Sequence, residues 1–558
     1  MKKILANGYR DRAVVAILLA VFFLEASAIA WKKSNTWDEP AHILAGYAHL
    51  KEGMDYLSPL NHPAFGRAVQ AIIPAVFLHL DFDPSVRPEE AEGSDFYPYA
   101  LKFLYENRVG AERLLFLCRL SNIVLAGLLG LTVFFWSKEL WGATGGVLSL
   151  FLYCLSPNIL AHSSLATTDM PITAFFFISI YCLYSIVERG FTYRRGLGAA
   201  VALSFALTSK HTAILLIPLF IAGFLIRAHS DRSKKTAAGL LSVFLATYLI
   251  IWAVYGFRYH SGGAHYEPLY WARFSGSSFA PLFGLLRRIR FLPEAYLYGI
   301  AGVLSGAGAG KPAFLMGAYS TTGWRSYFIT AFLIKTPIPT IILLAASVLY
   351  LLKDRARLPK ALYLVVPAVI IFAAMSMQKV NIGLRHVLPA YPFIFVLIGY
   401  APAITTRSVR AARYVLFACI AWYLYANVAI FPHQLAYFNE FTGGPRNGYK
   451  YLVDSNLDWG QDLNGLKKYM DENKIERINL AYFGMSDPRY FGIEYDYLPS
   501  FVIMNPRNVR AEVPLKGWFA ISATMLQGVY LRDRDFYRVF RETAPVDSIG
   551  YSIFIYRF

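Results

Sequence analysis

The sequence predicts a mainly α-helical, polytopic membrane protein with large segments on one side of the membrane. Of its 558 residues, 56% are hydrophobic and only 16% are charged, and the mean hydropathy is +0.40. Soluble globular proteins carry about 25% charged residues. The composition therefore excludes an ordinary soluble enzyme, a disordered chain and a disulfide-stapled secreted domain.

Eleven apolar runs are long enough to cross a bilayer alone or inside a helix bundle, since a spanning helix needs about 20 residues. The third and the fifth are the shortest. The first is too long for the apolar region of a signal peptide, so we interpret it as an anchor. The runs are residues 13–31, 114–136, 142–155, 165–187, 197–208, 211–226, 237–255, 327–352, 361–377, 387–404 and 414–431.

The positions of Lys and Arg predict the orientation, because short cytosolic loops are enriched in both. With a cytosolic N-terminus, the short cytosolic segments hold 19 basic and 5 acidic residues, which is +14 of the net charge of +18. The excess charge therefore indicates topology, and we expect no nucleic-acid partner. An odd number of spans places the C-terminus outside. We expect a multi-pass protein of the plasma (inner) membrane whose polar segments face away from the cytosol.

Two parts of the chain follow from this topology. Residues 1–431 form a transmembrane part with outer loops at 32–113 and 256–326, and residues 432–558 form a small extracytoplasmic α/β domain. In the first loop, two stretches have the apolar spacing of amphipathic helices on a membrane surface. In the C-terminal domain, Asp458 and Gln461 have the spacing of a helix N-cap pair. The amphipathic stretches are 41–52 and 63–80, and the expected strands are 478–483, 518–523 and 551–556.

Two acidic motifs lie at the expected outer surface. Asp38 and Glu39 follow the first span, where adjacent carboxylates suit a general base or a divalent cation held against phosphate. The alternative is helix capping next to Pro40. Asp169 lies at the outer end of the fourth span, where a carboxylate indicates a functional site by default, with helix capping again the alternative.

Several cations lie near the same surface. Arg67 would lie one turn into a helix starting at Pro63, and Arg is a good bidentate ligand for phosphate. Together the cations suit a lipid-phosphate head group whose tail lies among the helices. The alternatives are an interfacial snorkelling Arg and purely structural roles. The other cations at outer helix ends are Lys210, Lys335, Arg385 and His386.

Two other classes of protein remain as alternatives. A secondary transporter should place ionisable residues near the bilayer midplane and show repeats, whereas here they cluster at one face and no repeat is visible. A non-catalytic scaffold for cell-envelope assembly would explain the outer domain but not the acids and cations. The sequence contains no P-loop, dinucleotide fingerprint or nucleophile elbow.

The motifs together resemble the membrane-embedded glycosyltransferases of the GT-C fold, and within them family 39, which includes protein O-mannosyltransferases and the lipid A aminoarabinose transferase. The resemblance extends from about residue 10 to 500. The matching positions are Asp38-Glu39, His62-Pro63, Thr168-Asp169 with Pro171, Gly323-Trp324, Lys335-Thr336-Pro337, Gly383 with Arg385-His386 and Leu388-Pro389, and residues 454–463 (DSNLDWGQDL).

The resemblance implies a transfer, with inversion, of a sugar from a polyprenyl monophosphate to an acceptor lipid, glycan or protein. It implies that Asp38 is the base, that Glu39 supports it or binds acceptor, and that Asp169 is the second acid of the site. Arg67 stands where many family members have Lys. The resemblance leaves open a divalent cation such as Mg²⁺ or Mn²⁺, for which Asp38, Asp169 and His62 are the candidate ligands. Neither the sugar nor the acceptor follows from the sequence.

Overall fold

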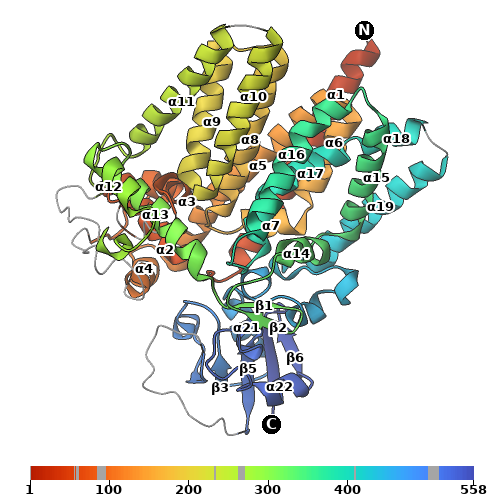
Figure 1. The fold of residues 1–558 in the computed structure, drawn as a ribbon. Helices are drawn as coiled ribbons and strands as arrows, with labels where there is room; N and C mark the ends of the chain where they lie inside the picture. Colours follow the sequence, from red (N-terminus) through yellow and green to blue (C-terminus); the bar gives the residue numbers. More distant parts are fainter. Residues whose placement is uncertain are drawn as a thin grey trace.

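The computed structural model describes residues 2–55, 57, 62–83, 96–231, 234–261, 271–407, 410–500 and 515–558, and every structural statement below concerns these residues. Most of the first 430 residues are helical, and a small sheet follows near the C-terminus. In Figure 1 the N-terminus lies at the top of the helices, and the chain ends in the sheet at the bottom of the molecule.

The helices of the first part stand in two groups in Figure 1, with α8 to α11 in one and α1, α5, α6 and α15 to α19 in the other. Their bounds are α1 Lys2–Lys32, α2 Glu39–Glu52, α3 Ala64–Phe77, α4 Phe96–Tyr105, α5 Ala111–Trp141, α6 Ala143–Cys154, α7 Pro157–Ser163, α8 Asp169–Arg189, α9 Tyr193–Ser209, α10 Leu216–Asp231, α11 Lys234–Val254, α12 Ala280–Arg288, α13 Glu294–Ala309, α14 Tyr327–Lys335, α15 Ile338–Lys353, α16 Leu358–Ser376, α17 Tyr391–Ile398, α18 Ala401–Arg407 and α19 Arg410–Ile430.

The predicted fold class is confirmed, but the predicted count of eleven spans is not. Among the described residues, eight helices are long and apolar enough to cross a membrane, or ten if two bent helix pairs each count as one span. The bends are 60° between α6 and α7 and 111° between α14 and α15, next to Pro337. The one predicted run that is not among these ten is the fifth, 197–208, which is the 17-residue helix α9 and stands beside α8 and α11 (Figure 1).

Burial separates central spans from peripheral ones. The apolar window of Leu384–Ile404 is 89% buried and that of Asp169–Arg189 is 72% buried, whereas those of α1 and α11 are each 22% buried. The peripheral helices turn large apolar side chains such as Leu24, Leu241 and Leu249 outward, as helices in contact with lipid do. The two central spans carry Arg385 and Asp169, so the charged groups of interest belong to the best-packed part of the bundle.

The first outer loop contains the two expected helices in different environments. Helix α2 is buried on all sides from Glu39 to Ala48, so it packs inside the protein and does not lie on the membrane surface as expected. Helix α3 is amphipathic in the sense that suits a lipid interface, because Val76 and Phe77 are exposed while Arg67 and Gln70 are buried.

The second outer loop contains helices α12 and α13 and a hairpin of β1 (Ala313–Leu315) and β2 (Ala318–Ser320). The glycine-rich stretch 302–310 continues helix α13 as far as Ala309. The tertiary structure therefore fixes a backbone that glycine alone would leave free.

The C-terminal part ends in a five-stranded mixed sheet of order β4-β3-β5-β7-β6, in which β3 is parallel to its neighbours β4 and β5 and the remaining pairs are antiparallel. All three predicted strands are present. The predicted N-cap pair is wrong, because helix α20 begins at Leu463 with Asp462 at the N-cap position. The elements are α20 Leu463–Glu472, β3 Ile478–Ala481, β4 Tyr495–Tyr497, β5 Trp518–Ser522, α21 Ala523–Leu526, α22 Arg538–Glu542, β6 Asp547–Ile549 and β7 Ile553–Arg557.

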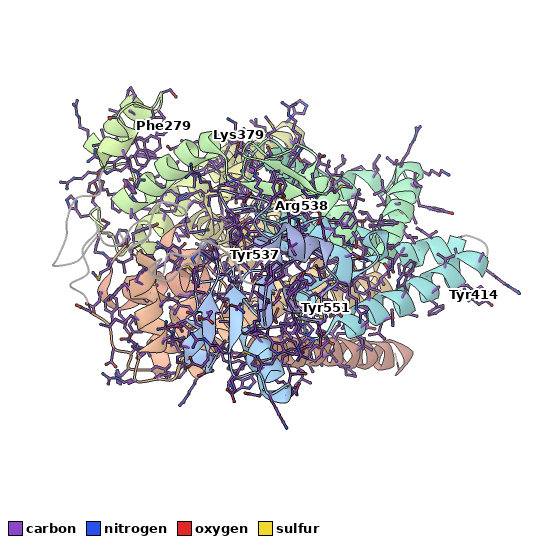
Figure 2. All side chains as sticks on the ribbon, turned by 90° about the horizontal axis from the view of Figure 1, so that it is seen from below. Phe279, Lys379, Tyr414, Tyr537, Arg538 and Tyr551 are labelled. Carbon is purple, nitrogen blue, oxygen red and sulfur yellow. The ribbon has the colours of Figure 1, made fainter. Side chains whose placement is uncertain are left out.

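The sheet covers one end of the helices. In the view from below, Tyr537, Arg538 and Tyr551 of this part lie near the middle of the picture, while Phe279 and Tyr414 lie at opposite edges (Figure 2). The sheet therefore overlies the ends of the central helices rather than the periphery of the bundle. The division at residue 431 stays a prediction.

Candidate active site

Four charged side chains alternate in sign at the junction between the helices and the C-terminal part. The guanidinium of Arg385 donates through Nη1 to Asp38 Oδ2 at 2.8 Å, and the same nitrogen lies 3.7 Å from Asp169 Oδ2. Lys210 Nζ then donates to Asp169 Oδ1 at 2.8 Å. The sequence predicted all four residues but not this order, in which each cation touches a carboxylate.

Each of these residues lies where a helix begins or ends. Asp38 is at the N-cap of α2 and Asp169 is the first residue of α8. Lys210 occupies an extended position between α9 and the short 3₁₀ helix His211–Leu215, and Arg385 lies in the 3₁₀ helix Leu384–Ala390. Such positions leave backbone donors and acceptors unpaired within the helix and tolerate polar side chains. Asp38 makes no side-chain cap bond, and the side chain of Asp169 accepts from Lys210 and Thr167 instead.

The two aspartates differ in access. The Asp38 side chain is 22% exposed and that of Asp169 is 1% exposed. Burial raises the pKa of Asp38, but the charge of Arg385 and its hydrogen bond outweigh burial, so the pKa lies below its usual value. Asp38 is therefore a charged carboxylate at neutral pH with a face that another molecule can reach.

Glu39 is completely enclosed. Arg119 of helix α5 donates hydrogen bonds to both carboxylate oxygens of Glu39, at 2.8 and 2.7 Å. The backbone N–H groups of Thr36 and Ala166 each donate to the same carboxylate at 2.7 Å. With its side chain fully buried and both oxygens engaged, Glu39 has no face for an acceptor. This geometry supports the role of holding the Asp38 segment and argues against acceptor binding.

Arg67 lies on helix α3, near the four charged side chains of Asp38, Arg385, Asp169 and Lys210. It is 3% exposed and donates through Nη1 to the carbonyl of Leu57 at 2.5 Å. Burial lowers its pKa to about 10, so it still carries its charge at neutral pH. A Cβ on Gly66 would lie 2.4 Å from the carbonyl oxygen of Ser209, so only glycine lets α3 approach the end of α9 and place Arg67 near Lys210.

Two histidines lie between Asp38 and Arg67. The rings of His42 and His62 meet edge to face with centroids 4.7 Å apart, and His62 Nδ1 lies 3.1 Å from Thr168 Oγ1. Burial lowers the pKa of His42 to about 4 and lowers that of His62 as well. Both are neutral at pH 7, and they add hydrogen-bonding groups to the site without adding charge.

Arg385 and His386 each have a buried polar atom to which the described part of the chain offers no hydrogen-bond partner. Arg385 Nε and His386 Nε2 are both buried and have no hydrogen-bond partner among the described residues. Buried polar atoms are normally paired, so such atoms call for a ligand or an ordered water. Their position beside Asp169 and Lys210, whose charges act on the His386 ring, suits an anion.

Lys335 does not join this group, contrary to the expectation. Its Nζ donates to the carbonyl oxygens of Leu435, Tyr437 and Asn456 at 3.0, 2.9 and 2.5 Å and lies over the Phe438 ring at 4.4 Å. An ammonium group has three N–H donors, and all three are used. Lys335 therefore ties the end of α14 to the start of the C-terminal part and has no donor left for a phosphate.

We expect Lys335→Met to lower the thermal unfolding midpoint and to leave the KM for a phosphate-containing substrate unchanged in the protein that stays folded. The reason is that the substitution leaves three buried carbonyl oxygens without their donor. Heating the detergent-purified variants and measuring steady-state kinetics checks both parts. A raised KM at normal stability would return Lys335 to the phosphate site.

The predicted metal ligands do not form a metal site. Among the residues that the structure describes, no group of three or more His, Cys, Asp or Glu side chains is arranged to hold a metal ion. Asp38 and Asp169 both face Arg385 instead, and a bound cation would have to displace that guanidinium.

Two further residues of the site belong to no motif that points to them. Tyr97 of helix α4 lies close to Trp37, with ring centroids 6.3 Å apart, and its hydroxyl interacts electrostatically with Asp38. The exposed Lys311, from the loop before β1, also acts on Asp38 and contributes to its lowered pKa. Neither residue belongs to a motif, and each reaches the site only because the outer loops fold over it.

Fold and site together define a polytopic membrane protein with a charged site at the covered end of its helices. Residues 111–255 match the model of the family described as dolichyl-phosphate-mannose-protein mannosyltransferase. This segment runs from α5 to α11 and includes Arg119, Asp169 and Lys210, but not Asp38 or Arg385. The match confirms, over this minor part of the chain, the resemblance to membrane glycosyltransferases that the motifs indicate. No curated protein sequence matches the chain.

Two solved structures align with most of this chain at low sequence identity. ArnT from Cupriavidus metallidurans bound to undecaprenyl phosphate is 12% identical, with 99% of this chain and 98% of that chain covered and a TM-score of 0.45. The Archaeoglobus fulgidus oligosaccharyltransferase tethered with an acceptor peptide is also 12% identical, with 91% and 61% covered and a TM-score of 0.43. A further structure of the archaeal enzyme contains Zn and sulfate. Neither similarity identifies a substrate or a residue of this chain.

Proposed function

We propose that this protein is an inverting glycosyltransferase that moves a sugar from a polyprenyl monophosphate to an acceptor on the non-cytosolic side of the membrane. The observation that carries the proposal is the alternating chain Asp38–Arg385–Asp169–Lys210, which joins an accessible carboxylate to buried cations at the outer ends of the central spans. A group transfer from a phosphate leaving group needs both a base for the acceptor and cations for the departing phosphate.

Asp38 is the general base of the proposed reaction. It accepts the proton of the acceptor hydroxyl or amine while the acceptor atom forms a bond to the anomeric carbon of the sugar. A carboxylate with a lowered pKa is a weak base, but a positioned base still accelerates such a step by about 10²–10⁴-fold. The bond from the anomeric carbon to the phosphate oxygen breaks on the opposite face, which inverts the configuration.

Arg385, His386 and Lys210 receive the departing polyprenyl phosphate. Arg385 and His386 supply the buried Nε and Nε2 atoms that have no partner among the described residues. Lys210 and Arg67 add further positive charge to the site. Asp169 holds Lys210 in place by accepting its hydrogen bond. Preorganised charges in a dry site stabilise a developing anion without reorganising, and this is a large share of the catalysis proposed here.

The orientation belongs to the same proposal. We place the N-terminus in the cytosol and the C-terminal part on the outer face of the plasma (inner) membrane. The strong excess of Lys and Arg in the predicted cytosolic segments supports this placement. It is also supported by the position of the site at the end of the bundle opposite the N-terminus (Figure 1).

The test uses protein purified in detergent, a panel of radiolabelled polyprenyl-monophosphate sugars and a membrane extract that supplies lipid, glycan and protein acceptors. We expect the wild type to release free polyprenyl phosphate from one donor and to label one acceptor class, which names both substrates. No turnover with any donor by folded protein would overturn the proposal. A transporter or a scaffold would then be the better interpretation.

Arg385→Ala gives a sharper expectation in the same assay. We expect its kcat/KM to fall by about 10²–10³-fold, the usual loss when one donor to a developing oxyanion is removed. Arg477→Ala is the matched control, because Arg477 pairs with Asp496 on the exposed side of the sheet. Equal activities of the two variants would contradict the role of Arg385.

A further inference from the structure

One short segment of the C-terminal part, residues 455–461, holds both sides of the Asp38–Arg385 pair. On the Arg385 side, Ser455 Oγ donates to the carbonyl of Ile382 at 2.7 Å, and Asn456 Oδ1 accepts from Leu384 N–H at 2.9 Å. A Cβ on Gly383 would lie 2.3 Å from Ser455 Oγ, so this contact requires glycine there. The loop that carries Arg385 is thus pressed directly against the segment.

On the Asp38 side, the same segment pairs with the backbone that precedes the aspartate. Trp37 N–H donates to the carbonyl of Trp459 at 2.9 Å, and Ser34 N–H donates to that of Gln461 at 3.1 Å. Ser34 Oγ donates to the carbonyl of Gly460 at 3.1 Å. The backbone just before Asp38 is therefore hydrogen-bonded to the C-terminal part.

The side chain of Trp459 lies between these two attachments. It is 2% exposed, and its ring lies 4.2 Å from the Arg385 guanidinium carbon. Gln461 fixes the local backbone, since it accepts from Trp459 N–H at 2.8 Å and donates to the carbonyl of Leu457 at 2.9 Å. The ring thus has a fixed position, and a guanidinium stacks favourably on an aromatic face.

We propose that Trp459 is the positioning residue for Arg385, and that segment 455–461 sets the geometry of the Asp38–Arg385 pair. The C-terminal part then completes the active site and does more than cover it or bind the acceptor. This inference rests on the proposed function. Without the ring, the guanidinium loses the surface on which it rests, and a long arginine side chain then samples several rotamers.

The role predicts a change in pH dependence that lost stability alone would not produce. Arg385 lowers the pKa of Asp38, so the base form persists well into the acid range and activity falls only as the pH drops through that lowered value. If Trp459→Leu releases Arg385, the pKa of Asp38 rises and the acid limb of the kcat/KM profile moves to higher pH. We also expect kcat to fall by about 10–100-fold.

Trp518→Leu is the matched control. Trp518 lies in the same C-terminal part, on β5, and its ring is stacked by Arg557 at 5.0 Å, away from the charged chain. We expect this variant to keep the wild-type acid limb. Trp459→Phe retains an aromatic face, so it should fold and show a smaller shift in the same direction.

The experiment compares kcat/KM from acid to neutral pH for the wild type and these three variants, using the donor that the wild type accepts. An acid limb of the kcat/KM profile that moves to higher pH in Trp459→Leu or Trp459→Phe, but not in Trp518→Leu, supports the inference. A wild-type acid limb in every folded Trp459 variant overturns it. An inactive wild type would instead overturn the proposed function.

Discussion

Asp38→Asn is expected to reduce transfer by about 10²–10⁴-fold while the protein still folds. The amide cannot accept the acceptor's proton, but it has nearly the same shape and its oxygen can still accept from Arg385 Nη1. The donor should therefore bind almost as well, and the loss should appear in kcat. Steady-state kinetics and a donor-binding measurement on the same preparation check both parts.

The matched control for this variant is Asp81→Asn. Asp81 lies in the same outer loop and pairs with Arg108, but both side chains are more than half exposed. Removing its charge should change neither kcat nor KM. If Asp38→Asn transferred sugar at the wild-type rate, the base would have to be sought elsewhere, and Asp169 would be the next candidate.

Arg119→Met is expected to destabilise the protein by about 3–5 kcal/mol, the usual effect of removing one partner from a buried ion pair. Arg119 is fully buried and donates to Glu39 and to the backbone carbonyls of Ala30, Lys33 and Ser34. The substitution leaves the Glu39 carboxylate without its counter-charge and three carbonyl oxygens without a donor. Folded proteins are stable by only about 5–15 kcal/mol, so the unfolding midpoint should drop sharply.

Thermal unfolding in detergent measures this effect, and Arg108→Met is the control. The Arg108–Asp81 pair is exposed to solvent, where an ion pair contributes little. Its unfolding midpoint should stay close to that of the wild type. An Arg119→Met variant that melts with the wild type would mean that Glu39 does not anchor the Asp38 segment.

The acidic pair at residues 38 and 39 illustrates how far the sequence alone can go. Both carboxylates were predicted to belong to the site, and both lie at the start of helix α2. Neighbouring residues at a helix start point in different directions, so Asp38 is partly exposed and pairs with Arg385, whereas Glu39 is buried against Arg119. Which of them is accessible depends on helix α5, which begins more than seventy residues later in the chain.

Lys335 is the counterexample among the cations. A lysine at the outer end of an apolar run looks the same in sequence as Lys210, yet Lys210 binds Asp169 and Lys335 binds three backbone carbonyls. The bend of 111° between α14 and α15 turns the end of α14 toward the C-terminal part. The direction of that bend is decided by packing, which a linear motif does not record.

The apolar pattern alone indicates the class of fold, because long apolar runs in a membrane form helices, in which the backbone polar groups bond to one another. The sequence also indicates which residue types the candidate site contains, since carboxylates and cations recur at the ends of these runs on one predicted side of the membrane. Which charged side chain pairs with which follows from the tertiary structure. Asp38, Arg385 and Trp459 come from three distant segments, and their contacts exist because the C-terminal part pairs with the backbone before Asp38. Contacts of this kind depend on distances and directions through space, which hydrophobic periodicity does not encode.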